Sequence, residues 1–253
     1  DISGTLQYML SQSVTGQFGV EYGGITMESD TADTGLSATN NRWITGTGEF
    51  NAQFDPVQLS VNAKILNESL ETDTLDQLAT TFGSYGLEAL FPVSDAISAI
   101  VGAKYETVTH DTMDILSRVS PYGRFNITPS NRVGLTISAF TGYEYESFLQ
   151  RWEMNPYIAH DAPLYPEEVT WGATVEANVE MLPGLNILGS IGQTSYENAF
   201  YWQHDSATGF FGIGEVNDVE VVNLDVGAHF TPTNWLTMKA SFETYVASFS
   251  SED

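Results

Sequence analysis

The chain of 253 residues contains no cysteine and few basic residues. The absence of cysteine excludes disulfide bonds and thiol chemistry. Only 8 Lys and Arg residues stand against 33 Asp and Glu residues, which gives a formal net charge of −25. Nucleic acid is therefore excluded as a partner, because binding to phosphates needs clustered Lys and Arg side chains.

Long apolar runs are missing as well. Hydrophobic residues make up 42% of the chain and the mean hydropathy is −0.12. No stretch approaches the about 18 consecutive apolar residues of a membrane-spanning helix. Any crossing of a bilayer must therefore be made by strands.

Motifs for catalysis and metal binding are also absent. The four histidines, His110, His160, His204 and His229, are scattered and form no His-x-x-His or His-x-x-x-His pair. There is no Gly-x-Ser-x-Gly elbow, phosphate-binding loop or dinucleotide fingerprint. We therefore expect no enzyme activity, no metal site and no cofactor.

What the chain does contain is strict alternation, seen best in residues 168–181. Val169, Trp171 and Val175 fall on one side of a strand, whereas Glu176 and Glu180 fall on the other. The segment is long for a soluble domain, where strands average about 5–6 residues. A tilted strand that crosses a bilayer needs about 9–11 residues with one apolar and one polar face. The pattern predicts a wall between lipid and water.

Ten charged residues within the predicted strands lie on the polar side of the alternation. A charge that faces lipid at the middle of a bilayer costs roughly 2–4 kcal/mol for Arg or Lys, whereas a charge that faces a wet lumen costs little. A soluble β-sandwich also alternates and is the competing interpretation. The predicted lumen-lining charges are Glu49, Lys64, Lys104, Glu106, Arg124, Glu176, Glu180, Asp225, Lys239 and Glu243.

Two kinds of connection separate the predicted strands. Short turns contain proline and small polar residues, as at 54–56, 91–95 and 182–184, whereas long polar segments lie at 147–166 and 199–217, among others. This layout is typical of an outer-membrane β-barrel with its long loops outside the cell. The fold class is all-β and antiparallel, with about twelve strands. They are expected at about 4–10, 16–27, 43–54, 57–67, 83–91, 96–108, 117–127, 132–146, 167–181, 185–198, 218–230 and 235–249.

Three details complete this prediction. Aromatic residues near the short turns, such as Phe54, Phe91 and Phe125, are expected to form an interfacial girdle. The pair Val221-Val222 interrupts the alternation and predicts a β-bulge. Acidic residues between strands are expected to be solvent-exposed loop charges that favour solubility. They include Glu68, Glu71, Asp73, Asp76, Glu167 and Glu168.

The directions of the first and last strands predict an open sheet. Strand 4–10 runs into a short turn and strand 235–249 leaves one, so both outer ends lie on the long-loop rim. A complete single-chain barrel normally has both ends on the periplasmic side. We therefore expect residues 1–253 to be one transmembrane barrel segment, without a plug domain, from a larger barrel.

From Val93 onward, the order of elements resembles the barrel of TonB-dependent outer-membrane receptors. The resemblance rests on a strand at 95–106, a strand and periplasmic turn at 120–139, an Asn155-Pro156 segment and a Pro166-Glu167 pair that opens a strand. Hairpins at 182–191 and 230–242 look like later ones of the family. The resemblance implies energised import of a scarce ligand, such as a metal chelate, vitamin or glycan, through about 22 strands.

The partners that follow are outer-membrane lipid, missing strands or a plug of the same chain, and a TonB-like energiser. The alternative function is a diffusive porin, or a structural or adhesive outer-membrane barrel without TonB coupling. Loop aromatics are the candidate ligand contacts, because exposed aromatics are costly unless they bind something or pack on one another. Packing of loop on loop across the mouth is the competing interpretation. The candidates are Tyr143, Tyr145, Trp152, Tyr157, Tyr201 and Trp202.

Overall fold

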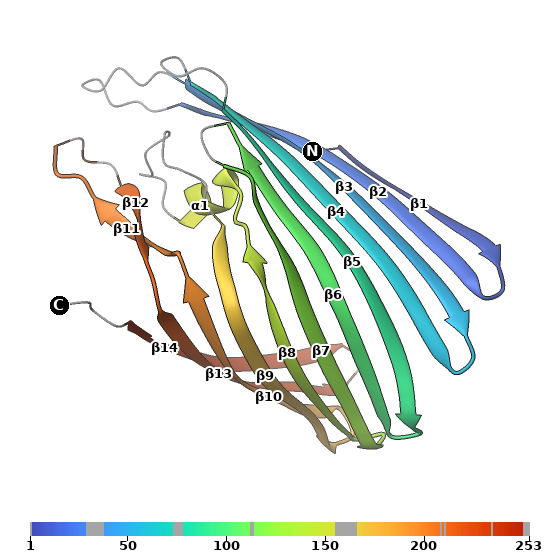
Figure 1. The fold of residues 1–253 in the computed structure, drawn as a ribbon. Helices are drawn as coiled ribbons and strands as arrows, with labels where there is room; N and C mark the ends of the chain where they lie inside the picture. Colours follow the sequence, from blue (N-terminus) through green and yellow to red (C-terminus); the bar gives the residue numbers. More distant parts are fainter. Residues whose placement is uncertain are drawn as a thin grey trace.

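Twelve strands form one antiparallel sheet, in which each strand pairs with its neighbours in sequence (Figure 1). The computed structural model describes residues 2–28, 38–72, 78–111, 114–154, 166–207, 209, 211–233 and 235–249. The strands of the sheet are β1 (Ile2–Ser11), β2 (Val14–Glu28), β3 (Ala38–Phe54), β4 (Val57–Thr72), β5 (Leu78–Ser94), β6 (Ile97–His110), β7 (Leu116–Ser130), β8 (Val133–Glu144), β9 (Glu167–Leu182), β10 (Leu185–Glu197), β13 (Val219–Thr233) and β14 (Leu236–Phe249). The all-β, antiparallel prediction and its twelve strands are confirmed.

The sheet curves strongly, so that it has an inner and an outer face (Figure 1). Cross-strand partners share a face, and the register links Lys64 to Ser84, Ser84 to Glu106 and Glu106 to Arg118 across β4–β7. The pairing of β9, β10 and β13 likewise places Glu176, Ser190 and Asp225 on one face of the sheet. The structure places all ten charges named from the alternation on the inner face.

An apolar band surrounds the outer face. On β4 it runs from Val57 to Ile65, close to the about 9–11 residues of a bilayer-crossing strand. Above it the outer face turns polar, where Asn67 Nδ2 donates a hydrogen bond of 2.8 Å to Thr81 Oγ1. Aromatic residues border the band. Phe54, Phe91, Phe125 and Trp235 are exposed near the short turns, and Tyr85, Tyr105 and Trp171 are exposed toward the long loops. Together they form the girdle that the sequence predicts.

The sheet is open. Among the described residues, β1 pairs only with β2 and β14 pairs only with β13, so these two strands are its edges. Every residue of β1 is exposed. Thr5–Leu10 does not form ladder pairs with residues 237–245 of β14, in agreement with the open sheet expected from the strand directions.

Two segments expected as irregular loops contain further elements. Helix α1 (Phe148–Met154) follows β8, and a separate two-stranded hairpin, β11 (Ala199–His204) and β12 (Phe211–Val216), stands between β10 and β13. Over the part of the chain that the structure describes, no helix has the length and apolar character needed to span a membrane.

The predicted bulge at Val221-Val222 is wrong, because β13 stays in register with both neighbours through these residues. A bulge occurs instead in β9, where Thr170 is passed over between Trp171 and Val169 in the pairing with β10. As a result, the side chain of Val169 turns inward and is almost fully buried. The alternation predicted at 168–181 therefore changes sides at its first residues.

Candidate functional site

The inner wall is hollowed by a depression of about 570 Å³ that extends over β4–β9. Its lining residues with a charge or an aromatic ring include Glu88, Lys104, Glu106, Tyr122, Arg124 and Phe140. They come from four consecutive strands, β5–β8, and share the inner face because of the alternation.

Tyr122 is one of the residues that line this depression. Its hydroxyl donates a hydrogen bond of 2.8 Å to Glu88 Oε2, on the strand beyond β6. The ring crosses Gly102 of β6 to reach it, and a Cβ at Gly102 would lie 2.5 Å from the ring. Glycine is therefore required at 102 for Tyr122 to lie flat. Lys104 Nζ lies 5.4 Å from the centre of the same ring, in a cation–π contact.

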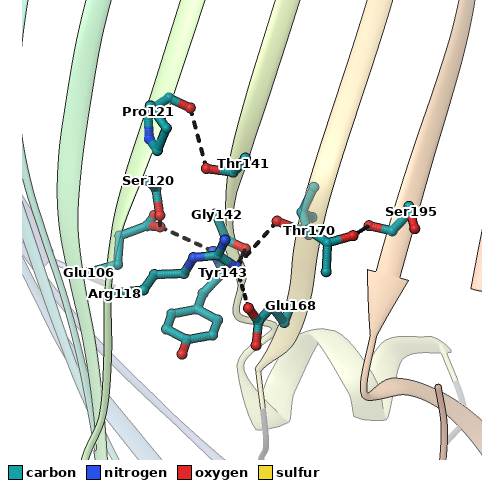
Figure 2. A network of polar contacts seen from close by, with 11 residues as sticks. Glu106, Arg118, Ser120, Pro121, Thr141, Gly142, Tyr143, Glu168, Thr170 and Ser195 are labelled. Carbon is teal, nitrogen blue, oxygen red and sulfur yellow. Dashed lines mark hydrogen bonds and ion pairs between the residues drawn. The ribbon is translucent and has the colours of Figure 1, made fainter. Parts of the chain in front are cut away.

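Glu106 joins three strands through its hydrogen bonds to Ser120 and Tyr143 (Figure 2). It is buried, and Oε2 accepts hydrogen bonds from Ser120 Oγ and from the backbone N–H of Tyr143 at 3.1 Å. Beside it, Arg118 Nη1 forms an ion pair of 2.7 Å with Glu168 and donates to the carbonyl of Val169 at 3.3 Å. These contacts hold β6–β9 together where the bulge interrupts the ladder.

A second polar cluster lies above the depression, on the long-loop side of β4. Glu68 is 1% exposed, although the sequence predicts an exposed loop charge. Its carboxylate accepts hydrogen bonds from Asn41 Nδ2 at 2.8 Å, from Tyr145 Oη at 3.2 Å and from the backbone N–H of Phe148 at 3.0 Å. Charge-assisted bonds of this kind are stronger than neutral ones. Glu68 therefore fastens the start of α1 to the wall from a strand 80 residues away in sequence.

The β11–β12 hairpin packs on the same place. Trp202 and Ile213 contact the buried pair formed by Leu70 of β4 and Phe148 of α1. The Arg151 guanidinium lies 4.8 Å from the ring centre of Phe200. We call α1 and the β11–β12 hairpin together the cap, since they cover the inner wall near the long-loop rim (Figure 1).

The hairpin leaves the sheet through two residues with left-handed backbone. Asn198 precedes β11 with φ 56°, and Asp218 follows β12 with φ 54°. Asn and Asp tolerate this region better than other side chains that are not glycine. The Asn198 N–H donates to Asn217 Oδ1 at 3.2 Å and joins the two exits. This pair of bends turns the hairpin away from β10 and β13 and toward α1.

Burial shifts the pKa of ionisable groups in the cap and beside it. Burial raises the pKa of the Glu146 carboxyl, and Arg151 opposes that shift only in part. Burial also lowers the pKa of Arg151, against the influence of Glu146. A carboxyl with a raised pKa favours the folded state most in acid, and its contribution falls as pH rises through that pKa. The contribution of Glu146 to the stability of the docked cap is therefore larger at mildly acidic pH than at neutral pH.

The loop aromatics named from the sequence have different surroundings. Tyr145 stacks on Phe82 with ring centres 5.7 Å apart, and Trp202 lies in the cap core. Tyr143 is half-buried, with Arg118 5.6 Å from its ring centre. Tyr201 is 47% exposed. The side chain of Trp152 and all of Tyr157 lie outside the described residues.

The sequence interpretation missed Arg118, Glu88, Tyr122 and Glu68 as members of these clusters. Arg118 and Tyr122 have the same parity as Arg124 on one strand, which is a signal that could have found them. No group of His, Cys, Asp and Glu suited to a metal ion occurs within the described ranges.

An open, strongly curved antiparallel sheet with an apolar outer face and a polar inner face has the architecture of part of a large membrane β-barrel. No protein-family model and no curated protein sequence matches the chain. Solved structures do match, over nearly its whole length.

The matches are barrel portions of TonB-dependent outer-membrane receptors, and the chain has their fold. The copper transporter OprC matches with a TM-score of 0.70 at 12% identity, over 99% of this chain and 48% of OprC. The FrpB iron transporter from Neisseria meningitidis matches with 0.65 at 12%, over 93% and 41%. BauA, the ferric preacinetobactin receptor from Acinetobacter baumannii, matches with 0.65 at 10%, over 96% and 44%. The chain thus spans less than half the length of these transporters and receptors.

Proposed function

We propose that the chain forms part of a transport barrel in a bacterial outer membrane. The observation that carries this proposal is the apolar outer band, bordered by aromatic residues and backed by a charged inner face. Soluble proteins rarely expose a contiguous apolar surface of this extent to water, whereas the outer face of a membrane barrel exposes such a surface to lipid. The polar inner face then lines a wet lumen, which is the function we assign to the ten inner charges.

We further propose that the barrel is completed by additional strands. Unpaired N–H and C=O groups at a sheet edge cost several kcal/mol each inside lipid, so β1 and β14 need partners there. The matched structures support strands of the same chain as these partners, because this chain spans only about half of their length. A plug domain inside the completed barrel belongs to the same proposal.

The transport that we propose is energised uptake of a scarce ligand through a TonB-like partner. Support comes from the fold shared with a copper transporter, an iron transporter and a ferric preacinetobactin receptor. The competing function is passive diffusion through a porin, or a structural or adhesive barrel. We favour the receptor over the porin because the matched structures are metal transporters and a ferric preacinetobactin receptor.

A gel experiment tests the membrane barrel. The full-length protein should remain in the membrane fraction until detergent is added. Its folded form should migrate differently from its boiled form in SDS gels, because a closed strand ladder resists the detergent until it is heated. Purification from the soluble fraction without detergent, with no change on boiling, contradicts the proposal.

Conductance in planar bilayers separates the two transport functions. A receptor whose lumen is filled by a plug should give no steady conductance steps when the full-length protein is inserted. A porin should give stable steps of uniform size. Stable conductance steps from the unmodified protein would therefore contradict the energised receptor but not the membrane barrel.

A further inference from the structure

Three carboxylates come together where the cap joins the wall. Glu144 ends β8 and Glu167 begins β9, and the register places these two residues directly opposite each other. Glu146 lies two residues further along the chain, in the link between β8 and α1. All three lie on the long-loop side of Trp171, which borders the apolar band. Like charges directly opposite on neighbouring strands destabilise a sheet, so this grouping is costly as long as the acids are charged.

The three carboxylates differ in their hydrogen bonds. Glu167 Oε1 accepts from the backbone N–H of Phe200 in β11 at 2.9 Å, and Glu144 Oε2 accepts from Tyr196 Oη of β10 at 3.5 Å. The Oε2 atom of Glu146 is buried, and none of the described residues donates a hydrogen bond to it. A buried carboxylate without donors is costly while it is charged, and the cost falls when it takes up a proton.

The positive charges nearby do not balance these acids. Arg151 of α1 is 1% exposed, and its guanidinium is attracted by both Glu146 and Glu167. Arg118, further along the wall, forms its ion pair with Glu168. When all three acids are charged, they therefore outnumber the guanidinium that faces them, and they repel one another.

We propose that these three carboxylates form a proton-operated latch, which holds the cap on the wall in acid and loosens it as the pH rises. A proton taken up by the group removes the repulsion between Glu144 and Glu167 or the cost of burying a charged Glu146. The donors on Phe200 and Tyr196 keep an acceptor in either case, because a protonated carboxyl still has a carbonyl oxygen. Once the protons are lost, undocking of the cap relieves both costs, because it lets water reach the carboxylates. Access to the inner wall from the long-loop rim then depends on the acidity of the surroundings.

The acid–base properties of the three groups agree with this direction. Burial raises the pKa of the Glu144, Glu146 and Glu167 carboxyls, and neighbouring carboxylates raise the pKa of Glu144 and Glu167 further. A carboxyl whose pKa is higher in the docked state stabilises docking fully below its ordinary pKa. That contribution is lost as the pH rises through the raised pKa. Docking should therefore weaken from mildly acidic to neutral pH.

The other ionisable groups at this end of the wall respond differently. Burial raises the pKa of the Tyr145 and Tyr196 hydroxyls, so both stay neutral. The charge of Glu68, which also attracts Arg151, is stabilised by three hydrogen-bond donors. His110 is buried at the long-loop end of β6, where burial lowers its pKa, so its protonation in acid weakens the folded state. The direction of the pH response therefore separates the latch from His110.

Hydrogen exchange followed by mass spectrometry tests the latch in the full-length protein in detergent micelles. The exchange rate of residues 199–204 and 211–216, divided by the intrinsic rate at each pH, gives the opening equilibrium of the hairpin. This opening should increase about tenfold or more from about pH 5 to about pH 7.5, since each proton lost changes an equilibrium by up to about tenfold per pH unit. The wall strands should remain protected at both pH values, which separates opening of the cap from unfolding of the sheet.

Variants assign the response to the carboxylates. The double variant Glu144→Gln with Glu146→Gln leaves Glu167 facing Arg151. It should retain at neutral pH the small opening equilibrium that the unmodified protein has in acid. The matched control is Glu215→Gln, which removes an exposed carboxylate from the hairpin itself and should follow the unmodified protein. Protection of the wall strands shows that each variant is folded.

Each of three results overturns the latch. The first is an opening equilibrium of the unmodified protein that does not change with pH. The second is an opening that decreases as the pH rises, as His110 would cause, and the third is an unchanged pH response in the double variant. The inference goes beyond the proposed transport function, because docking of the cap is measured without a ligand or a membrane. Failure of the latch therefore leaves the membrane barrel and its transport standing.

Discussion

Val175→Arg should destabilise the protein in lipid vesicles by roughly 2–4 kcal/mol. Val175 lies in the middle of the outer face of β9, 40% exposed. Its cross-strand neighbours are Ile137 of β8 and Ile191 of β10. An arginine at this point is surrounded by hydrocarbon, which does not solvate its charge. The side chain must therefore extend toward the membrane surface to reach water. The measurement is the unfolding free energy in urea, followed by tryptophan fluorescence.

The matched control is the next residue. Glu176→Arg also places an arginine on β9, but on the inner face between Thr136 and Ser190. There the charge meets water, and the change in unfolding free energy should stay below about 1 kcal/mol. Equal losses for the two variants would mean that both faces of β9 meet the same solvent, and the membrane barrel would have to be abandoned.

Glu68→Ala should release the cap from the inner wall. The substitution removes the acceptor of three donors, on Asn41, Tyr145 and Phe148. Each buried donor left without a partner costs about 1–3 kcal/mol, so the loss is roughly 3 kcal/mol or more. Trypsin reports the release directly, because Arg151 of α1 is 1% exposed in the docked cap. Cleavage after Arg151 should become about 100-fold faster, as the open population rises with the lost free energy.

Glu71→Ala provides the control. It removes a carboxylate from the same strand, but from an exposed position, and should leave the cleavage rate at Arg151 unchanged. Glu68→Gln keeps one acceptor oxygen and should fall between the two. If Glu68→Ala and Glu71→Ala are cut at the same rate, the cap is held by Leu70 and Trp202 packing instead of the carboxylate.

The twelve strands were predictable because each obeys one local rule. Where one face of a strand is apolar and the other polar, as in Val175 and Glu176, the period of two fixes both its conformation and its orientation. The short turns then fix which strands pair. The bulge at Thr170 carries no comparable signal, since the local sequence Glu168-Val169-Thr170 alternates perfectly.

The cap was not predictable, because its stability comes from distant residues. Helix α1 has 7 residues, too few to be stable alone, and its start is capped by Glu68 of β4. Glu68 itself sits among loop acids in the sequence, so nothing local distinguishes it from the exposed Glu71. The depression was predictable only in part: alternation places Lys104 and Arg124 on one face, but it does not give the hydrogen bonds of Tyr122 and Ser120 with Glu88 and Glu106.

The directions of the two edge strands set a counting rule for closure. β1 runs from the long-loop rim toward a short turn, and β14 runs back from a short turn to the long-loop rim. An antiparallel strand added beside β14 must descend, and the strand added beside β1 must ascend, so additions close the ring only in even numbers. Large outer-membrane transporters have about 22 strands. Extending the 12 strands of this sheet to that number takes an even number of additional strands, as the rule requires. A strand joined directly to β1 or to β14 would therefore be connected at the long-loop rim, opposite the short turns.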